Sequence, residues 1–505
     1  MMIRLNQMIV RIRPAALCAG VAALWPLAAA AWGPAQHITA PAYAAGGSWT
    51  ARNGATGLAA SRDTVWLVWT DGIKVLPNTG HQVLCKRYDG GAWAGDTVVG
   101  YRGNWRGHNW YPACAVDPAG TVHAVWESNE YEFGGGYDLS YTSVRGGIWS
   151  GQQRLVANAA NTWYPAIAAT ADGAVHVCWQ DDREGGFRLF HKSLAGAGWS
   201  AETAVPGGQV AASFPSIAAY GNTIAVAWQD FRSGTFQVHV KELGGAGWGG
   251  DSAVSHSGTG AFTPCLAVDQ GGGYHVAWED WRDGNAEVYY RRFDRTTGTW
   301  GSEQRLTADP WRSRAPVLVC RGDSLADLFW EDDRGGYFQV MHRRALRGSW
   351  YPETTLTAGW ADNRCPAACA DERGNLHLVW SSFGVEPPTA RPDLFAMAEY
   401  VDPWTKAVPS AGPAATASLP LRVSPNPAAG SAVISFAGDG RDDVASIRIY
   451  AVTGQLVRAW ERGPSAGEVR WDCRDDRGRA VAAGVYLVAV RLGGRRGTAR
   501  VAVVR

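Results

Sequence analysis

The sequence predicts an all-β protein, a seven-bladed β-propeller followed by a small immunoglobulin-like β-sandwich. Two observations predict this fold class. Alternating apolar and polar runs that end in tryptophan recur about every 50 residues along most of the chain. The last stretch, from residue 421 to 505, loses that period and carries roughly six or seven other short strand-like runs.

The composition excludes several classes of protein. Of 505 residues 18% are charged, and the formal net charge is +1, which predicts neither a basic nucleic-acid surface nor an acidic disordered tail. The 26 tryptophans outnumber the 17 tyrosines and 13 phenylalanines, so a repeated element is expected to use tryptophan. Because the charge is balanced, we expect no nucleic-acid partner.

The first 31 residues are typical of a secretory signal peptide. Arg4, Arg11 and Arg13 give a positive start, an apolar run follows from residue 15 to 32, and small residues at 28–31 suit cleavage. A membrane anchor is the alternative, but Pro26 interrupts a run that is already short for a bilayer. We expect a protein that is secreted or held at the outer cell surface.

The tryptophan repeat defines the propeller, which we place at residues 32–407. Each of seven tryptophans ends the second strand of a unit, and by its recurrence is expected to pack between blades. These residues are Trp69, Trp126, Trp179, Trp228, Trp278, Trp330 and Trp380. A proline opens the first strand of six units, where no ladder donor is needed: Pro112, Pro165, Pro215, Pro264, Pro316 and Pro366.

The units carry two further strands each, and the sequence indicates how a ring would close. A third strand follows the polar turn after each tryptophan, and a glycine-rich turn and another tryptophan begin a fourth strand. Residues 32–39 read like the fourth strand at 300–307, so we expect the N-terminus to complete the seventh unit, with residues 404–408 as the alternative. An open stack of hairpins would expose edges that a closed ring does not.

A linker rich in proline, alanine and serine at 408–420 leads to the C-terminal part, 421–505. Its motifs are SPNP at 424–427, IRIYAVTGQLVR at 447–458 and WDCRDDRGRAVAAGVYLV at 471–488. These resemble the C-terminal sorting domain of the type IX secretion system and the immunoglobulin-like domain of flagellar hook-capping (FlgD-type) proteins. The resemblance implies outer-membrane secretion machinery as a partner. Cys473 stands where such domains often carry glycine, and a passive stabilising sandwich is the alternative.

The propeller loosely resembles sialidase-like (BNR-type) repeat proteins in unit length and in the glycine turn before strand four. The aspartate of the sialidase box is missing from these turns. Arg314-Ala-Pro316 and Arg364-Cys-Pro366 only echo the Arg-Ile-Pro motif of that family, and a nucleophilic tyrosine with its glutamate cannot be placed. The catalytic residues therefore stay unknown, and the sequence leans away from an enzyme.

Candidate ligand-binding residues come from the loops between strands two and three and between successive units, which share one face of a propeller. Aromatic rings stack on sugars, and guanidinium groups bind hydroxyls and carboxylates. The candidates are Trp105, Arg106, Trp110, Tyr111, Glu127, Trp163, Tyr164, Trp281, Trp311, Arg312, Arg314 and Arg364. His108, Glu130 and Glu132 also interrupt the repeat.

Other recurrent residues are interpreted as structural. The pattern Trp-[Gln/Glu]-Asp-x-Arg occurs four times, from Trp179, Trp228, Trp278 and Trp330, so its aspartate should fix the turn and its arginine should pair with a neighbouring blade. His123, His176, His275 and His377 recur at similar strand positions and are expected to pack rather than bind metal. No metal, cofactor or cysteine bridge is assigned.

The sequence thus favours an exported or cell-surface propeller that binds an extracellular ligand, preferably a glycan. A sialidase-like glycoside hydrolase is the first alternative. A structural surface protein that docks another protein is the second.

Overall fold

The structure is a computed structural model. It describes residues 32–33, 35–39, 48–49, 57–62, 64–75, 78–100, 108–129, 136–157, 160–196, 198–322, 324–359, 361–383, 392–399, 421–436, 445–451, 456–462, 467–475, 478–492 and 495–504. Every regular element in these ranges is a β-strand, which confirms the all-β class. The same ranges contain no helix that could cross a membrane. The predicted signal peptide and the 408–420 linker lie outside the described residues.

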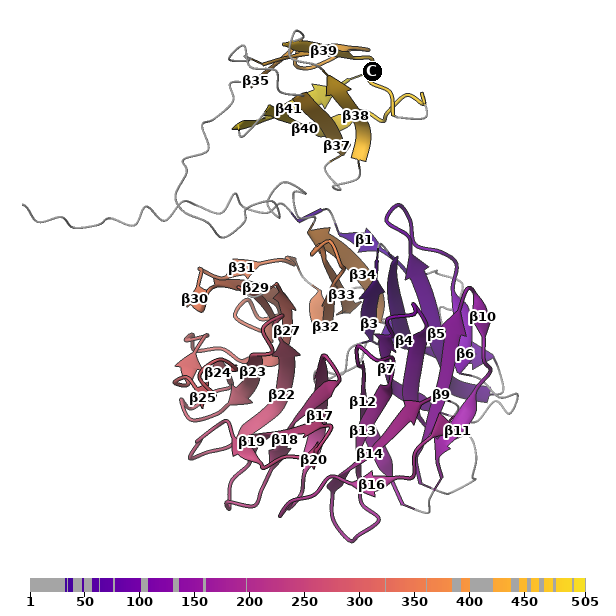
Figure 1. Cartoon of the computed structure of the whole chain (residues 1–505), viewed down its shortest axis with the longest axis vertical. Coiled ribbons are helices and arrows are strands. Elements are labelled where there is room, and N and C mark those ends of the chain that lie inside the picture. The colour runs from indigo at the N-terminus through magenta and orange to yellow at the C-terminus, as the bar shows by residue number, and fades with distance from the viewer. Residues whose placement is uncertain are drawn as a thin grey trace, which may run out of the picture.

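Seven antiparallel sheets precede residue 400, numbered here sheets 1 to 7 in chain order, and they resemble propeller blades (Figure 1). The first strands are β3 (Leu58–Ser61), β7 (Asn109–Val116), β12 (Thr162–Ala169), β17 (Ser213–Tyr220), β22 (Ala261–Val268), β27 (Ser313–Arg321) and β32 (Asp362–Ala370). The second strands are β4 (Thr64–Val75), β8 (Val122–Ser128), β13 (Val175–Asp181), β18 (Thr223–Asp230), β23 (Tyr274–Asp280), β28 (Leu325–Asp332) and β33 (Leu376–Phe383).

The outer strands complete each sheet. The third strands are β5 (Asn78–Tyr88), β9 (Asp138–Arg145), β14 (Arg188–Ala195), β19 (Gln237–Gly244), β24 (Glu287–Asp294), β29 (Gln339–Leu346) and β34 (Pro392–Glu399). The fourth strands are short, and in sheets 2 to 6 they are split into two pieces: β6 (Thr97–Gly100), β10 (Ile148–Trp149), β11 (Gln153–Val156), β15 (Gly198–Trp199), β16 (Thr203–Ala204), β20 (Gly247–Trp248), β21 (Ser252–Ala253), β25 (Thr299–Trp300), β26 (Gln304–Arg305), β30 (Ser349–Trp350) and β31 (Thr354–Thr355). In sheet 1, β2 (Ser48–Trp49) also pairs with β4.

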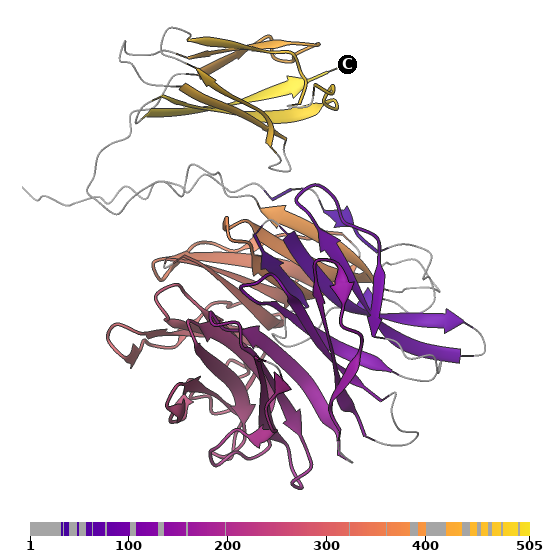
Figure 2. The same ribbon diagram turned by 45° about the vertical axis from the view of Figure 1, so that its right-hand side comes forward.

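The sheets follow one another around a closed ring (Figures 1 and 2). Each first strand contacts the first strand of the next sheet, from β7 through β12, β17, β22 and β27 to β32, and β3 contacts both β32 and β7. A buried apolar cluster fills each of the seven junctions. The ring therefore has no terminal sheet that is packed on one side only.

The N-terminal strand closes sheet 7. β1 (Gln36–His37) pairs antiparallel with β34, where Gln36 lies opposite Ala396, and Trp32 forms an isolated bridge with Glu399. This confirms the closure expected from residues 32–39. The alternative segment, 404–408, lies outside the described residues.

The seven strand-two tryptophans are buried between sheets, as predicted. In sheets 3 to 6 the indole N–H donates to the aspartate two residues later, at 3.0 to 3.4 Å. Sheets 2 and 7 lack that aspartate. There Asn109 and Asn363, on the neighbouring first strands, accept from Trp126 and Trp380 at 2.8 and 3.0 Å. Either arrangement satisfies a buried polar group that would otherwise destabilise the fold.

The C-terminal residues form two sheets around one apolar cluster. β35 (Leu421–Ser424), β36 (Ala432–Phe436) and β39 (Glu468–Trp471) make one sheet, and β37 (Ala445–Ala451), β38 (Leu456–Arg462), β40 (Gly484–Leu492) and β41 (Arg495–Val503) make the other. Trp471, Ile434, Ile447 and Val488 pack between them. Cys473 has a φ of 51°, a left-handed conformation that glycine adopts without strain.

Candidate functional site

A repeated backbone feature builds one face of the ring. The residue before each first-strand proline has a positive φ, between 47° and 55°, although none of the six is glycine: Tyr111, Tyr164, Phe214, Thr263, Ala315 and Cys365. A register shift in each first strand accompanies it. Such a conformation is costly for a non-glycine residue and persists only where neighbours fix it.

In sheets 3, 4, 5 and 7 the neighbour that fixes it is the side chain after the strand-two tryptophan of the preceding sheet. Glu127 accepts a hydrogen bond from the Tyr164 N–H at 2.6 Å, and Gln180 accepts from the Phe214 N–H at 2.9 Å. Gln229 and Glu331 make the same bond to Thr263 and Cys365, at 2.8 and 2.7 Å. We call this contact the junction bond. Glu127, expected to interrupt the repeat, therefore occupies a repeated position.

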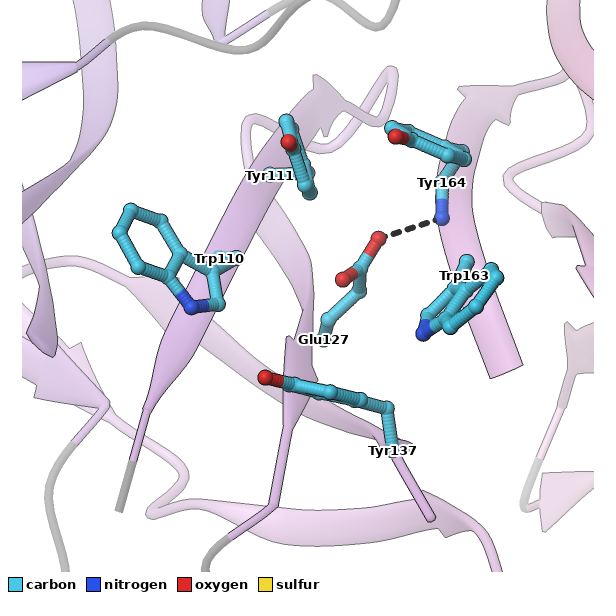
Figure 3. Close-up of a pocket in the computed structure, with 6 residues that line it drawn as sticks. All are labelled: Trp110, Tyr111, Glu127, Tyr137, Trp163 and Tyr164. Carbon is cyan, nitrogen blue, oxygen red and sulfur yellow. Dashed lines mark hydrogen bonds between the residues drawn. The ribbon is translucent and has the colours of Figure 1, made fainter. Parts of the chain in front are cut away.

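The junction between sheets 2 and 3 contains a hollow of about 280 Å³. Its lining consists of five aromatic side chains and one carboxyl group: Trp110, Tyr111, Glu127, Tyr137, Trp163 and Tyr164 (Figure 3). These residues come from the start of β7, the end of β8, the turn before β9 and the start of β12. The volume lies near the lower end for ligand sites, roughly 300–1,000 Å³, and suits one sugar unit better than a long segment.

Glu127 lies at the centre of the six residues (Figure 3). Glu127 is only 3% exposed. Burial raises the pKa of its carboxyl group to about 8, although the hydrogen bond from the Tyr164 N–H opposes the rise. Burial also raises the pKa of the Tyr137 hydroxyl, and the nearby Glu127 charge adds to that rise. At neutral pH Glu127 is therefore predominantly an uncharged acid.

The aromatic side chains at the positive-φ positions occupy sheets 2 to 4 only. The Tyr111 and Tyr164 ring centroids lie 4.7 Å apart, and those of Tyr164 and Phe214 lie 4.6 Å apart. The equivalent positions in sheets 5 to 7 are the smaller Thr263, Ala315 and Cys365. The face is thus aromatic on one side of the ring, and the hollow belongs to that side.

Two histidines pack behind Trp110. Nδ1 of His81 lies 2.7 Å from Nδ1 of His108, and the His81 ring centroid lies 3.8 Å from that of Trp110. Burial and, to a smaller extent, the His108 charge lower the pKa of His81 to about 4. The backbone N–H of His108 donates to Asn129 Oδ1 at 2.6 Å. This pair orients the Trp110 ring.

The three candidate arginines that the structure describes gather elsewhere, at the junction between sheets 6 and 7. The guanidinium carbons of Arg314 and Arg364 lie 4.3 and 4.1 Å from the Phe338 ring centroid, and that of Arg312 lies 5.5 Å away. Each is near a carboxylate: Arg312 with Asp333, Arg314 with Glu331 and Arg364 with Asp362. The structure does not bring them into the aromatic hollow.

The remaining candidates divide into two groups. Trp281 and Trp311 are exposed, at 40% and 49%, on loops of sheets 5 and 6, and they do not line the hollow. The indole N–H of Trp281 donates to Oε1 of Glu279 at 2.9 Å. Trp105, Arg106, Glu130 and Glu132 lie outside the described residues.

The repeated Asp-x-Arg pairs are structural, but most of their partners differ from the expectation. Each arginine binds the aspartate of its own motif at 2.6 to 2.7 Å. A second carboxylate comes from the fourth-strand region of the same sheet: Glu202, Asp251, Glu303 or Glu353. Arg334 also pairs, at 2.7 Å, with Asp309 on the loop that leads from sheet 5 to sheet 6. The expected pairing with a neighbouring blade is therefore found for Arg334, whereas the ion pairs of Arg183, Arg232 and Arg282 lie within their own sheets.

The recurrent histidines are hydrogen-bonded inside sheets. His123 contacts the Tyr141 hydroxyl at 2.7 Å, His176 contacts His191 at 2.9 Å, and His275 contacts Asp269 at 3.1 Å. Within the described ranges, no cluster of three or more metal-ligating side chains occurs. The eight cysteines of these ranges are all free thiols.

Sequence reasoning missed Tyr137, although a signal for it exists. In five sheets, the backbone carbonyl of the residue just before the third strand accepts an N–H from the start of the next sheet, at or directly before its first strand. That residue is Tyr137, Phe187, Phe236, Ala286 or Phe338. An aromatic residue therefore recurs before strand three, and Tyr137 alone among these five carries a hydroxyl.

The similarity to one solved structure supports the fold. An ulvan lyase, a polysaccharide lyase, aligns with a TM-score of 0.52 at 11% identity, covering 74% of this chain and all (100%) of that one. PorZ, a surface component of the type IX secretion system of Porphyromonas gingivalis, aligns at 15% identity with a TM-score of 0.41 over 90% of this chain. A Hadza microbial sialidase aligns at 12% identity with a TM-score of 0.40, over 63% of this chain and 73% of its own.

The chain spans 60% of the length of the PorZ structure. No protein-family model matches this sequence. No curated protein matches it either. The likeness to the ulvan lyase extends to the fold alone.

Proposed function

We propose that this chain is an exported seven-bladed β-propeller that binds an extracellular glycan in the hollow between sheets 2 and 3. The observation that carries the proposal is the lining of that hollow, in which five aromatic rings surround one buried carboxyl group. Aromatic faces stack on the apolar faces of sugars, and a few polar groups among them fix orientation. The closed ring of seven sheets supports the propeller architecture.

A screen of the mature chain, residues 32–505, on a glycan array tests this function. We expect binding that is lost in the double variant Trp110→Ala/Trp163→Ala. Phe262→Ala is the matched control, because Phe262 holds the same register position as Trp110 and Trp163 but lies outside the hollow. Equal loss in the control, or no binding by the wild type, would contradict a glycan site in the hollow.

Glycan cleavage is the second candidate function. A buried acid whose pKa is raised to about 8 suits a proton donor to a glycosidic oxygen. The three candidate arginines that the structure describes lie at the junction between sheets 6 and 7, so the hollow offers no sialidase-type arginine clamp for a substrate carboxylate. Incubation of array hits and a fluorogenic sialoside with the mature chain, followed by a product assay, would reveal turnover.

We further propose that residues 421–505 form an immunoglobulin-like sorting domain that engages outer-membrane secretion machinery. The two-sheet packing around Trp471 and the motifs of this region support this role. Deletion of residues 421–505 should leave the propeller in the periplasm, as measured by fractionation of expressing cells. Unchanged export of the truncated chain would favour a passive stabilising sandwich.

A further inference from the structure

The position of Glu127 does not itself require an acid. Gln180 and Gln229 hold the equivalent positions in sheets 3 and 4, and the amide oxygen of each accepts the same junction bond, at 2.9 and 2.8 Å. An uncharged amide therefore suffices to fix the positive-φ residue of the next sheet. The carboxyl group at residue 127 supplies something that the fold does not need.

The two carboxyl oxygens of Glu127 face different surroundings. Oε1 accepts the junction bond from the Tyr164 N–H at 2.6 Å, whereas the other oxygen, Oε2, points into the space between Trp110 and Tyr137 (Figure 3). The other titratable residues that line the hollow are Tyr111 on β7, Tyr137 before β9 and Tyr164 on β12. Among the described lining residues none carries a positive charge.

This arrangement assigns the proton of the uncharged acid. Oε1 accepts from a backbone N–H and so acts as the carbonyl-like oxygen, which leaves the proton on Oε2. Burial favours this uncharged form, with a pKa of about 8. The group that faces the hollow is then an O–H donor, and on ionisation it becomes an acceptor.

We propose that Glu127 determines the specificity of the hollow as an uncharged hydrogen-bond donor, its Oε2–H meeting an acceptor oxygen of the bound sugar. The proposal rests on the glycan-binding function above. The acceptor is a ring, glycosidic or acyl carbonyl oxygen of a sugar whose apolar face stacks on Trp110 or Trp163. When Glu127 is ionised, Oε2 and the sugar oxygen are both hydrogen-bond acceptors, so their hydrogen bond is lost and binding weakens.

The binding test uses cellohexaose and chitohexaose, two neutral oligosaccharides that differ in the acyl carbonyl. Their affinities for the wild-type mature chain and for Glu127→Gln are measured by calorimetry on either side of the Glu127 pKa of about 8. We expect wild-type affinity to fall about tenfold across that pKa, and Glu127→Gln, whose amide donates at both pH values, to change less than about threefold. Which of the two oligosaccharides binds identifies the acceptor.

Three binding outcomes would overturn the proposal. The first is that the affinities of wild type and Glu127→Gln fall equally as the pH rises. The second is that the affinity of the wild type does not change with pH. The third is that Glu127→Gln no longer binds at the lower pH. The Trp110→Ala/Trp163→Ala variant separates this result from failure of the proposed function, because it should abolish binding at both pH values.

A second measurement decides the protonation state even where neither oligosaccharide binds, which would count against the proposed function alone. Glu127 is uncharged in the folded protein up to a pKa of about 8 but ionises near 4.5 when unfolded, so the folded state loses stability as the pH rises through that window. Glu127→Gln avoids this loss. We expect its melting temperature to exceed that of the wild type by a margin that grows between those two pH values and is constant above them.

Glu331→Gln is the matched control for that measurement. Glu331 makes the same junction bond, but its carboxylate lies 3.6 Å from the Arg314 guanidinium. Replacement should therefore not stabilise the protein as the pH rises. A margin for Glu127→Gln that stays flat across the window would show that Glu127 is ionised in the hollow, and the proposal would fail.

Discussion

The junction between sheets 2 and 3 and the junction between sheets 6 and 7 use the same backbone for different chemistry. In the first, the ring of Tyr137 lies with Trp110 and Trp163 around Glu127. In the second, Arg314 and Arg364 take the register positions of the two tryptophans, and both stack on Phe338.

The junction bond is the constant part of this comparison. Glu127 and Glu331 each accept a backbone N–H from the next first strand, at 2.6 and 2.7 Å. What differs is the charge beside the carboxyl group: rings leave Glu127 desolvated, whereas Arg314 lies 3.6 Å from Glu331. The comparison teaches that the ring architecture fixes the position of the acid, and that the flanking side chains decide whether it lies among aromatic rings or beside a cation.

The largest expected effect comes from transplanting one junction onto the other. Trp110→Arg/Trp163→Arg should remove both stacking faces and favour the ionised form of Glu127, so glycan affinity should fall about a hundredfold or more. Titration calorimetry on the mature chain measures this loss. Retention of binding would break the comparison, because it would place the ligand away from these rings.

The next effect is on folding. Glu127→Ala leaves the Tyr164 N–H without its acceptor at a strained positive φ, and we expect a loss of about 1–3 kcal/mol in the free energy of unfolding. Glu331→Ala should cost a similar amount, since it removes the same bond at Cys365. Denaturant unfolding of both variants measures the two costs. A negligible cost in either would mean that the positive-φ residue needs no such partner.

Tyr137→Phe should have a smaller effect. It keeps the ring but removes the hydroxyl, so we expect glycan affinity to fall about threefold to tenfold while stability is unchanged. Because Phe187, Phe236 and Phe338 occupy the same position before strand three, phenylalanine is already compatible with this backbone. A surface binding assay against the array hits would measure the change, and an increase in affinity would contradict a role for the hydroxyl.

The smallest effect belongs to the arginine junction. Arg314→Gln and Arg364→Gln remove partly exposed ring contacts, each contributing about 0.5–1 kcal/mol to stability. Glycan affinity should stay within about twofold of the wild type. A large loss of binding in these variants would extend the glycan site across the ring and blur the distinction between the two junctions.

Most of the ring could be predicted from the sequence because its determinants are periodic. The tryptophans recur with strand spacing, and residues 32–39 repeat the pattern of an ordinary fourth strand. Five of the six residues that line the hollow were predicted for the same reason, although they lie at strand ends rather than in loops. The ring of Tyr137 was missed because its turn is three residues longer than those of sheets 3 to 6, which places Tyr137 11 rather than 8 residues after the strand-two tryptophan.

The separation of the arginines from the aromatic hollow could not be predicted in the same way. Spacing along the chain places Arg314 and Arg364 in loops of the correct face, but it does not say that a ring at residue 338 lies between them. The exposed position of Trp281 and Trp311 is a similar case, because a loop residue can point along the face or away from it.

The N-terminal strand has a mechanical consequence. β34 ends at Glu399, immediately before the segment that leads to the C-terminal sheets, and it is held by β33 on one side and β1 on the other. Glu399 also binds Arg344 of sheet 6 at 2.6 Å. Tension transmitted along the chain from the C-terminal part would enter the ring at a strand anchored on both edges, so the attachment point resists peeling better than an outermost strand would.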